Sequence, residues 1–251
     1  MRWIVLLGLV ACTGDDTDVD TSTDTGVDTD DDSETDVDTD TEADTGVAVP
    51  LEGVGTITGD CGPLDGDDLL GTEALAFYTE IDLPSAFQDS ALTDGGQYIL
   101  DAGNLNQSSL YSEIFAFEML ARCELAELLQ TETEVVYDNP QGKKTDLVVD
   151  IEGVRVGVSV VRAVGFPRDD PYTEAQALNI LEDKLADVPI AADNASDASE
   201  WDRSILAVVA YSPDHVTSIA AALPNVSPSV RGDTILYVTA TNGTDGFIYG
   251  D

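Results

Sequence analysis

Positive charge is scarce in this chain: ten lysines and arginines and one histidine stand against 50 aspartates and glutamates. Such an acidic surface repels phosphate backbones, so we do not expect nucleic acid as a general ligand. Cysteine is scarce too, with three residues, and no zinc-binding spacing is present. Neither a glycine-rich phosphate loop nor a G-x-S-x-G motif occurs, which disfavours nucleotide-binding and serine-hydrolase chemistry.

The chain opens with MRWIVLLGLVAC, whose apolar run is too short to span a bilayer and is typical of a secretory signal. Its last four residues, LVAC, resemble the lipobox of bacterial lipoproteins. The resemblance implies a signal peptide over residues 1–11 and a lipidated Cys12 that anchors the protein in the membrane of the cell envelope. Thr13 supplies no acidic signal for inner-membrane retention, so we expect the outer membrane. The alternative is a plain signal peptide with an incidental cysteine.

Residues 13–46 are almost entirely Asp, Thr, Gly, Ser and Glu, without an aromatic side chain. They cannot bury enough apolar surface to offset the ordering entropy, which predicts a disordered acidic tether over residues 12–46. A calcium-binding module is the alternative, but the glycine and glutamate of a calcium loop do not arrive at the required spacing. The tether holds 15 acids and no base, and Arg2 lies in the signal, which leaves 35 acids and nine bases, a net charge of −26, for the rest.

Two cysteines remain, Cys61 and Cys123. Outside the cytoplasm such a pair usually forms a disulfide, which would attach the GDCGPLDGDD loop to a helix. Two buried free thiols are the alternative.

The remaining residues suffice for one domain. We expect residues 47–108 to form a loop-rich first part of this domain, with short helices such as 71–81. Residues 109–251 are expected to form its α/β core. Within the core, helical spacing extends from Ser112, a candidate N-cap, to Leu128. Three strands are expected next, at 133–139, 144–153 and 154–164, with a tight turn at Glu152-Gly153.

A helix capped by Thr173, an apolar strand at 203–212, a helix starting at Pro213 and a last strand after Asp233, with a hairpin at Asn242-Gly243, complete the order. The sequence therefore predicts an α/β (α+β) fold, in which helices flank a mixed central sheet of about five strands.

This order, an acid in the first helix, an Asp at the start of the second strand and the GVSVVR third strand together resemble the PD-(D/E)xK nuclease superfamily. The resemblance covers residues 109–249 and implies a restriction-endonuclease-like fold. The core is also similar to a group of proteins with YSE-F-FE, KTDLLV and GVSV-RA patterns, from which no activity transfers. In the nuclease superfamily, a second-strand Asp and a third-strand acid bind Mg²⁺ or Mn²⁺, a lysine two residues later activates water, and a helix glutamate often assists.

Carried over residue by residue, Asp146 matches the second-strand acid, and Glu118 or Glu113 matches the helix acid. Glu118 falls on the apolar face of its helix, where a carboxylate must be paired, metal-bound or protonated. Ser159 and Val161 stand where the third-strand acid and lysine belong, and neither can supply that chemistry.

A rearranged catalytic site could use Lys184 from the second helix, Arg162, or Asp150. The simpler interpretations are a surface lysine for Lys184, a carboxylate pair such as Arg162–Glu118, and a solvent-facing Asp150. Strand alternation also places Arg162 on the face opposite Val161. For the single histidine, His215, the simpler interpretation is a side chain that caps the first turn of its helix or is exposed to solvent there.

The leading hypothesis is a monomeric, lipid-anchored envelope protein with a nuclease-like fold and a degenerate metal site, acting by binding or structure rather than catalysis. One alternative is an extracytoplasmic Mg²⁺- or Mn²⁺-dependent phosphodiesterase built from Glu118, Asp146, Ser159 and Lys184 or Arg162. The other is an envelope protein–protein interaction module, which would expose an apolar patch.

Overall fold

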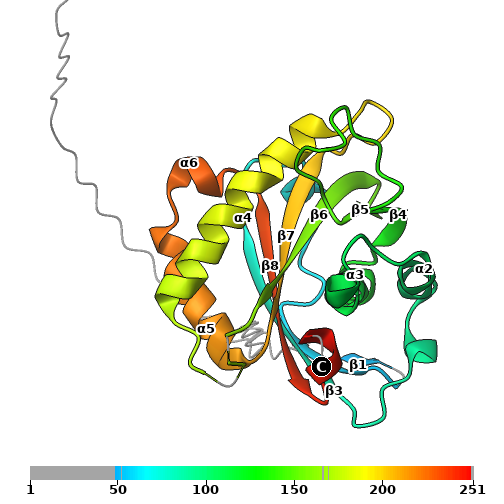
Figure 1. Cartoon of the computed structure of the whole chain (residues 1–251), viewed down its shortest axis with the longest axis vertical. Coiled ribbons are helices and arrows are strands. Elements are labelled where there is room, and N and C mark those ends of the chain that lie inside the picture. Colours follow the sequence, from blue (N-terminus) through cyan, green and yellow to red (C-terminus); the bar gives the residue numbers. More distant parts are fainter. Residues whose placement is uncertain (1–48, 52, 166, 169, 250–251) are drawn as a thin grey trace, which may run out of the picture. The chain divides into compact units, whose positions relative to one another are not determined.

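Eight strands form one mixed sheet in the order β1–β2–β3–β8–β7–β6–β5–β4 (Figure 1). The computed structural model describes residues 49–51, 53–165, 167–168 and 170–249, so the predicted signal, Cys12 and the tether lie outside the described residues. The strands are β1 Val49–Leu51, β2 Gly55–Gly59, β3 Ala76–Leu83, β4 Glu127–Thr131, β5 Leu147–Ile151, β6 Val154–Ala163, β7 Arg203–Ala210 and β8 Ile235–Gly243. The α-helices are α1 Gly66–Leu70, α2 Asp94–Ala102, α3 Leu110–Cys123, α4 Glu174–Asn194, α5 Pro213–Ala222 and α6 Pro228–Arg231.

The middle of the sheet is parallel and its two flanks are antiparallel. Strands β3, β8, β7 and β6 run parallel to one another, whereas β1–β2–β3 and β6–β5–β4 pair antiparallel. The chain order α3–β4–β5–β6–α4–β7–α5–β8 is the predicted one. The predicted mixed sheet with flanking helices is therefore confirmed.

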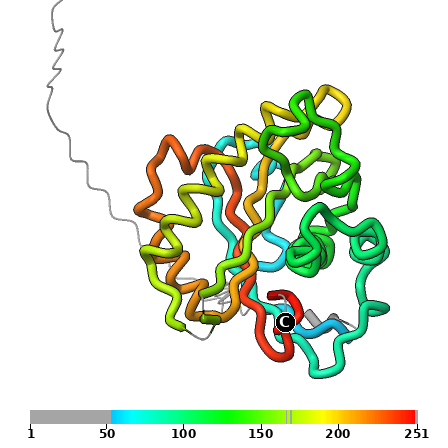
Figure 2. The backbone as a smooth tube through the Cα atoms, viewed as in Figure 1, coloured from blue at the N-terminus to red at the C-terminus, as the bar shows by residue number. Residues whose placement is uncertain are grey.

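The sheet is larger than predicted because residues 49–83 contribute three strands. The segment 71–81, expected to be helical, instead ends in β3, which lies parallel to β8 along its whole length. Figure 2 shows the cyan β3 beside the red β8, although about 150 residues separate them in the sequence. Thr79, Ile81 and Leu83 are buried at every second position of β3, as in a strand, but its parallel pairing with β8 joins the two ends of the domain and has no local signal.

Three further predictions are wrong: the end of one helix, one strand and one hairpin. Helix α3 ends at Cys123, and Leu125 then adopts a left-handed φ of 55°, so the apolar residues up to Leu128 belong to β4 and not to the helix. The expected strand at 133–139 consists of turns and a single bridge at Tyr137. The hairpin expected at Asn242-Gly243 is absent, since a 3₁₀ helix over Gly246–Tyr249 follows β8.

Helices cover both faces of the sheet. In Figure 1, α2 and α3 lie on one side of the central strands, and α4 and α5 lie on the other. Val158 of β6 and Phe117 of α3 belong to one apolar cluster, while Ala163 of β6 and Leu181 of α4 belong to the second. In the described part of the chain, no helix is long and apolar enough to cross a membrane.

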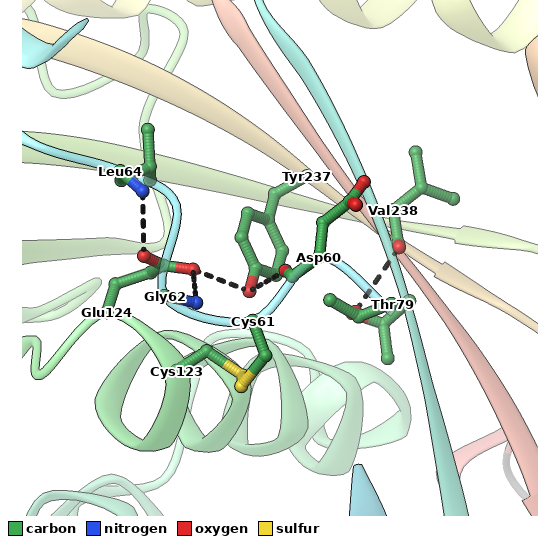
Figure 3. The surroundings of a disulfide bond; sticks show 10 residues. Asp60, Cys61, Gly62, Leu64, Thr79, Cys123, Glu124, Tyr237 and Val238 are labelled. Carbon is green, nitrogen blue, oxygen red and sulfur yellow. Dashed lines mark hydrogen bonds between the residues drawn. A yellow bond between two sulfur atoms is a disulfide. The ribbon is translucent and has the colours of Figure 1, made fainter. Parts of the chain in front are cut away.

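The predicted disulfide between Cys61 and Cys123 is present and joins the segment after β2 to the end of α3 (Figure 3). The next residue, Glu124, is 5% exposed. Its carboxylate accepts hydrogen bonds from the backbone N–H groups of Gly62 and Leu64, both at 3.1 Å, and from the Tyr237 hydroxyl at 3.0 Å. A covalent link and a buried carboxylate thus attach this loop to α3 and β8.

Replacing both Cys61 and Cys123 with alanine should lower the free energy of unfolding by about 4 kcal/mol, because the bridge closes a long loop in the unfolded chain. Urea denaturation followed by circular dichroism measures the loss. The wild-type protein treated with a thiol reductant is the matched control and should lose about the same amount. An unchanged unfolding midpoint after full reduction would contradict this account.

Candidate functional site

Asp146 lies in a pocket of about 410 Å³ to which five segments contribute. The start of α3 supplies Glu113, the turn after β4 supplies Glu132, and α4 supplies Lys184. The complete lining is Asn106, Ser109, Ser112, Glu113, Glu132, Asp146, Val160, Val161, Arg162, Val164 and Lys184. The fold therefore brings together two of the predicted acids and both of the predicted cations.

Asp146 is held at the start of β5 by the neighbouring strand. Its N–H donates to the Val158 carbonyl at 3.1 Å, and its Oδ2 accepts the Val160 N–H at 2.6 Å. Burial raises the pKa of this carboxyl to about 7, and the charge of Glu132 adds to the rise. The Val160 N–H and the charge of Lys184 lower the pKa and oppose it.

Glu113 is 4% exposed and has only neutral donors. Its Oε1 accepts hydrogen bonds from Asn104 Nδ2 at 2.5 Å and from Ser109 Oγ at 2.9 Å. Burial raises the pKa of Glu113 to about 8, and the charge of Asp146 contributes to the rise. Two carboxyls with raised pKa values thus share one pocket. Groups with perturbed pKa values are frequent at functional sites.

The two cations reach the pocket from different elements. Lys184 is half-buried on α4 and acts on Asp146 through its charge. Arg162, near the end of β6, donates from Nη1 to the carbonyls of Ser108 at 2.8 Å and Ile248 at 3.4 Å. Ser108 lies in the 3₁₀ turn that leads into α3, so Arg162 is on the α3 face, whereas Val161 packs in the cluster beneath α4, as strand alternation predicts.

Ser159 and Val161 contribute no charged group to the site. The Ser159 hydroxyl lies 3.4 Å from the Thr145 hydroxyl and does not line the pocket. Val161 lines it with an apolar side chain. Asp150 lies at the opposite end of β5, where its Oδ1 accepts the Gly153 N–H in the β5–β6 turn.

Glu118 lies away from this pocket, and its predicted pairing with Arg162 is wrong. Its Oε2 forms an ion pair with Arg122 Nε at 2.8 Å, and its Oε1 accepts from the N–H and hydroxyl of Thr93 at 2.8 and 2.6 Å. Since Thr93 is the N-cap of α2, this fully buried carboxylate joins α2 to α3. The apolar-face argument detected a buried paired acid, but its partner comes from the same helix.

Sequence reasoning missed Glu132 and underestimated His215. Glu132 lies in the turn after β4, directly before the segment expected to form a strand at 133–139, and only the fold places it beside Asp146. His215 does contact the cap of its helix, with Nδ1 2.7 Å from Ser212 Oγ, but it is 5% exposed and stacks on Tyr172 instead of being solvated. Burial lowers the pKa of this imidazole.

A resident divalent cation fits these residues poorly. Within the described ranges, no three His, Cys, Asp or Glu side chains are grouped so that they could hold one ion. Asp146 Oδ2 is already engaged by Val160, and the third-strand carboxylate is missing. Glu113 and Asp146 are the residues that could contribute ligands.

Comparison with known proteins gives one partial match. No family model matches the chain, and no solved structure matches it. The AAC-rich mRNA clone AAC4 protein of Dictyostelium discoideum is 36% identical over 167 residues, which is 64% of this chain. The chain spans only 24% of that protein's length, and the printed name describes no activity.

Replacing Glu113 with glutamine should stabilise the domain progressively as the pH rises. The unfolded carboxyl ionises above 4.5, whereas the folded one stays protonated until about pH 8, so wild-type stability falls across this window. Glutamine mimics the protonated form, and the variant should gain about 4 kcal/mol over the wild type at about pH 9 relative to about pH 4. Urea denaturation at both pH values tests this, with the exposed Glu200→Gln as control. A pH-independent difference would contradict the assignment.

Glu118→Gln should destabilise the fold by about 3 kcal/mol, because it leaves Arg122 without its buried partner. Thermal and urea unfolding measure the loss. A variant as stable as the wild type would show that the pair does not hold α2 on α3.

Proposed function

We propose that this chain is a lipid-anchored envelope protein whose folded domain resembles PD-(D/E)xK nucleases and acts by binding a ligand rather than by hydrolysing one. The observation that carries the proposal is the make-up of the Asp146 pocket. Ser159 and Val161 occupy the positions of the family's third-strand acid and lysine, and neither adds a carboxylate or an amine to the pocket. The metal-binding half of the nuclease chemistry is therefore missing.

The proposed location in the cell envelope is based on the amino-terminal sequence. LVAC ends a short apolar run, and lipidation of Cys12 would bury acyl methylenes in the membrane. The like charges of residues 13–46 repel one another, so this segment would hold the domain away from the bilayer. An outer-membrane location is favoured because the residue directly after Cys12 is Thr13 and not an acid.

The domain's charge supports a binding role for a small ligand over degradation of nucleic acid. A net charge of −26 outside the signal and tether disfavours contact with a polyphosphate chain. The pocket itself differs from this background, because Arg162 and Lys184 line it together. Its volume of about 410 Å³ lies within the range of small-molecule sites.

A metal-dependent phosphodiesterase is the second candidate, and one observation favours it. Glu113, Asp146 and Lys184 reach the same pocket, so two carboxylates and an ammonium group are present although they come from unexpected positions. Mg²⁺ can bind through one or two carboxylates when waters and substrate phosphates complete its coordination. This candidate requires the cation to displace the protons that Glu113 and Asp146 retain near neutral pH.

Calorimetric titration of Mn²⁺ and Mg²⁺ into the full chain separates the two candidates. The proposal expects the wild type and Asp146→Asn to give the same weak heats, which arise from the acidic segment. Asp150→Asn, in the β5–β6 turn, is the matched control. A site of one ion per chain that disappears only in Asp146→Asn, together with metal-dependent cleavage of a phosphodiester, would replace the binding role with the phosphodiesterase.

A further inference from the structure

The outer edge of β4 is open in the described part of the chain. β4 is the last strand of the sheet and pairs with β5 alone, with an irregularity at Leu129. Among the described residues, no other main-chain hydrogen bond reaches Glu127–Gln130. An edge of this kind presents unpaired N–H and C=O groups that can pair with another extended chain.

A groove of about 620 Å³ runs between this edge and the two neighbouring helices. Figure 1 shows α2 and α3 beside β4 at this end of the sheet. Ala121 of α3 contributes apolar surface beside the buried Phe117 ring, and the Tyr98 hydroxyl of α2 donates to Glu134 Oε1 at 2.6 Å. Tyr98 is 50% exposed and Leu129 40% exposed, so apolar surface is accessible beside the open strand.

The groove carries charge of one sign. Asp94, Glu127 and Glu134 line it, and its lining includes no lysine, arginine or histidine. The nearby Arg122 of α3 is engaged by Glu118 and by the Ala91 carbonyl. A ligand of this groove must therefore bring positive charge as well as apolar groups.

Charge also decides between the available occupants. The chain's own residues 13–46 contain 15 acids and no base, so like charge opposes their docking here. A second copy of the domain would place the same three carboxylates against each other across a β4–β4 contact. A partner with basic residues meets neither obstacle.

We propose that this groove binds an extended segment of a partner protein, rich in lysine or arginine and in β-branched apolar residues, which adds to the sheet as a strand beside β4. Main-chain hydrogen bonds to β4 would supply affinity, and the carboxylates and apolar wall would select the sequence. The site is separate from the Asp146 pocket and does not depend on its role.

The test uses a fluorescent ten-residue peptide of alternating lysine and valine, with anisotropy measured on the full chain. Binding should be at least about tenfold tighter than for alternating glutamate and valine, because the charge is reversed. It should also be at least about tenfold tighter than for alternating lysine and proline, which keeps the charge but cannot complete a strand ladder. Equal binding of the lysine–proline peptide, or no binding of the lysine–valine peptide, would overturn the proposal.

Two variants locate the binding site. Glu127→Lys, which reverses a charge, and Leu129→Asn, which removes an apolar side chain without changing the charge, should each weaken binding about tenfold, whereas Asp183→Lys, on the exposed side of α4, should change it less than about twofold. Circular dichroism confirms that each variant is folded. Amide hydrogen exchange should slow in β4 when the peptide binds. Equal losses from Glu127→Lys and Asp183→Lys would show diffuse attraction to an acidic surface and would overturn the proposal.

Discussion

The desolvation of three glutamates, two on α3 and one directly after it, is the constraint on which the arrangement of this domain depends. Glu113, Glu118 and Glu124 are 4%, 0% and 5% exposed. A carboxylate removed from water costs several kcal/mol unless donors replace the lost hydration. Each of the three accepts hydrogen bonds from a different segment of the chain and so attaches that segment to α3 or its end.

The three carboxyls differ in the groups that donate hydrogen bonds to them. Glu124 is satisfied by two backbone N–H groups and Tyr237, and Glu118 by Arg122 and Thr93. Glu113 has only an amide and a hydroxyl as donors; burial raises its pKa to about 8, and the charge of Asp146 adds to the rise. Burial raises the pKa of Glu124 as well, but of the three glutamates only Glu113 lines the Asp146 pocket. The other two hold the walls around it.

The same helix separates two distinct surfaces. Its first turn faces the pocket with Arg162 and Lys184, while Phe117 and Ala121 face the groove beside β4. Seating α2 against α3 requires glycine, because a Cβ on Gly95 would lie 2.4 Å from the Phe117 ring and one on Gly96 would lie 2.2 Å from the fixed Glu118 carboxylate. The groove thus has its shape because two small residues let the helices approach closely.

Local sequence signals determined the elements from β5 to α5, because turn residues, caps and apolar periodicity act over a few neighbours. The Glu152-Gly153 turn, the Thr173 cap and Pro213 at the start of α5 are all present. Asp146 was also found from its place at the start of a strand, and cysteine count with compartment indicated Cys61–Cys123. Only the tertiary structure decided that β3 pairs with β8 and that Glu132 and Lys184 meet Asp146. These contacts join residues that lie far apart in the sequence, and no local sequence pattern links them. Only the packing of the whole domain brings them together.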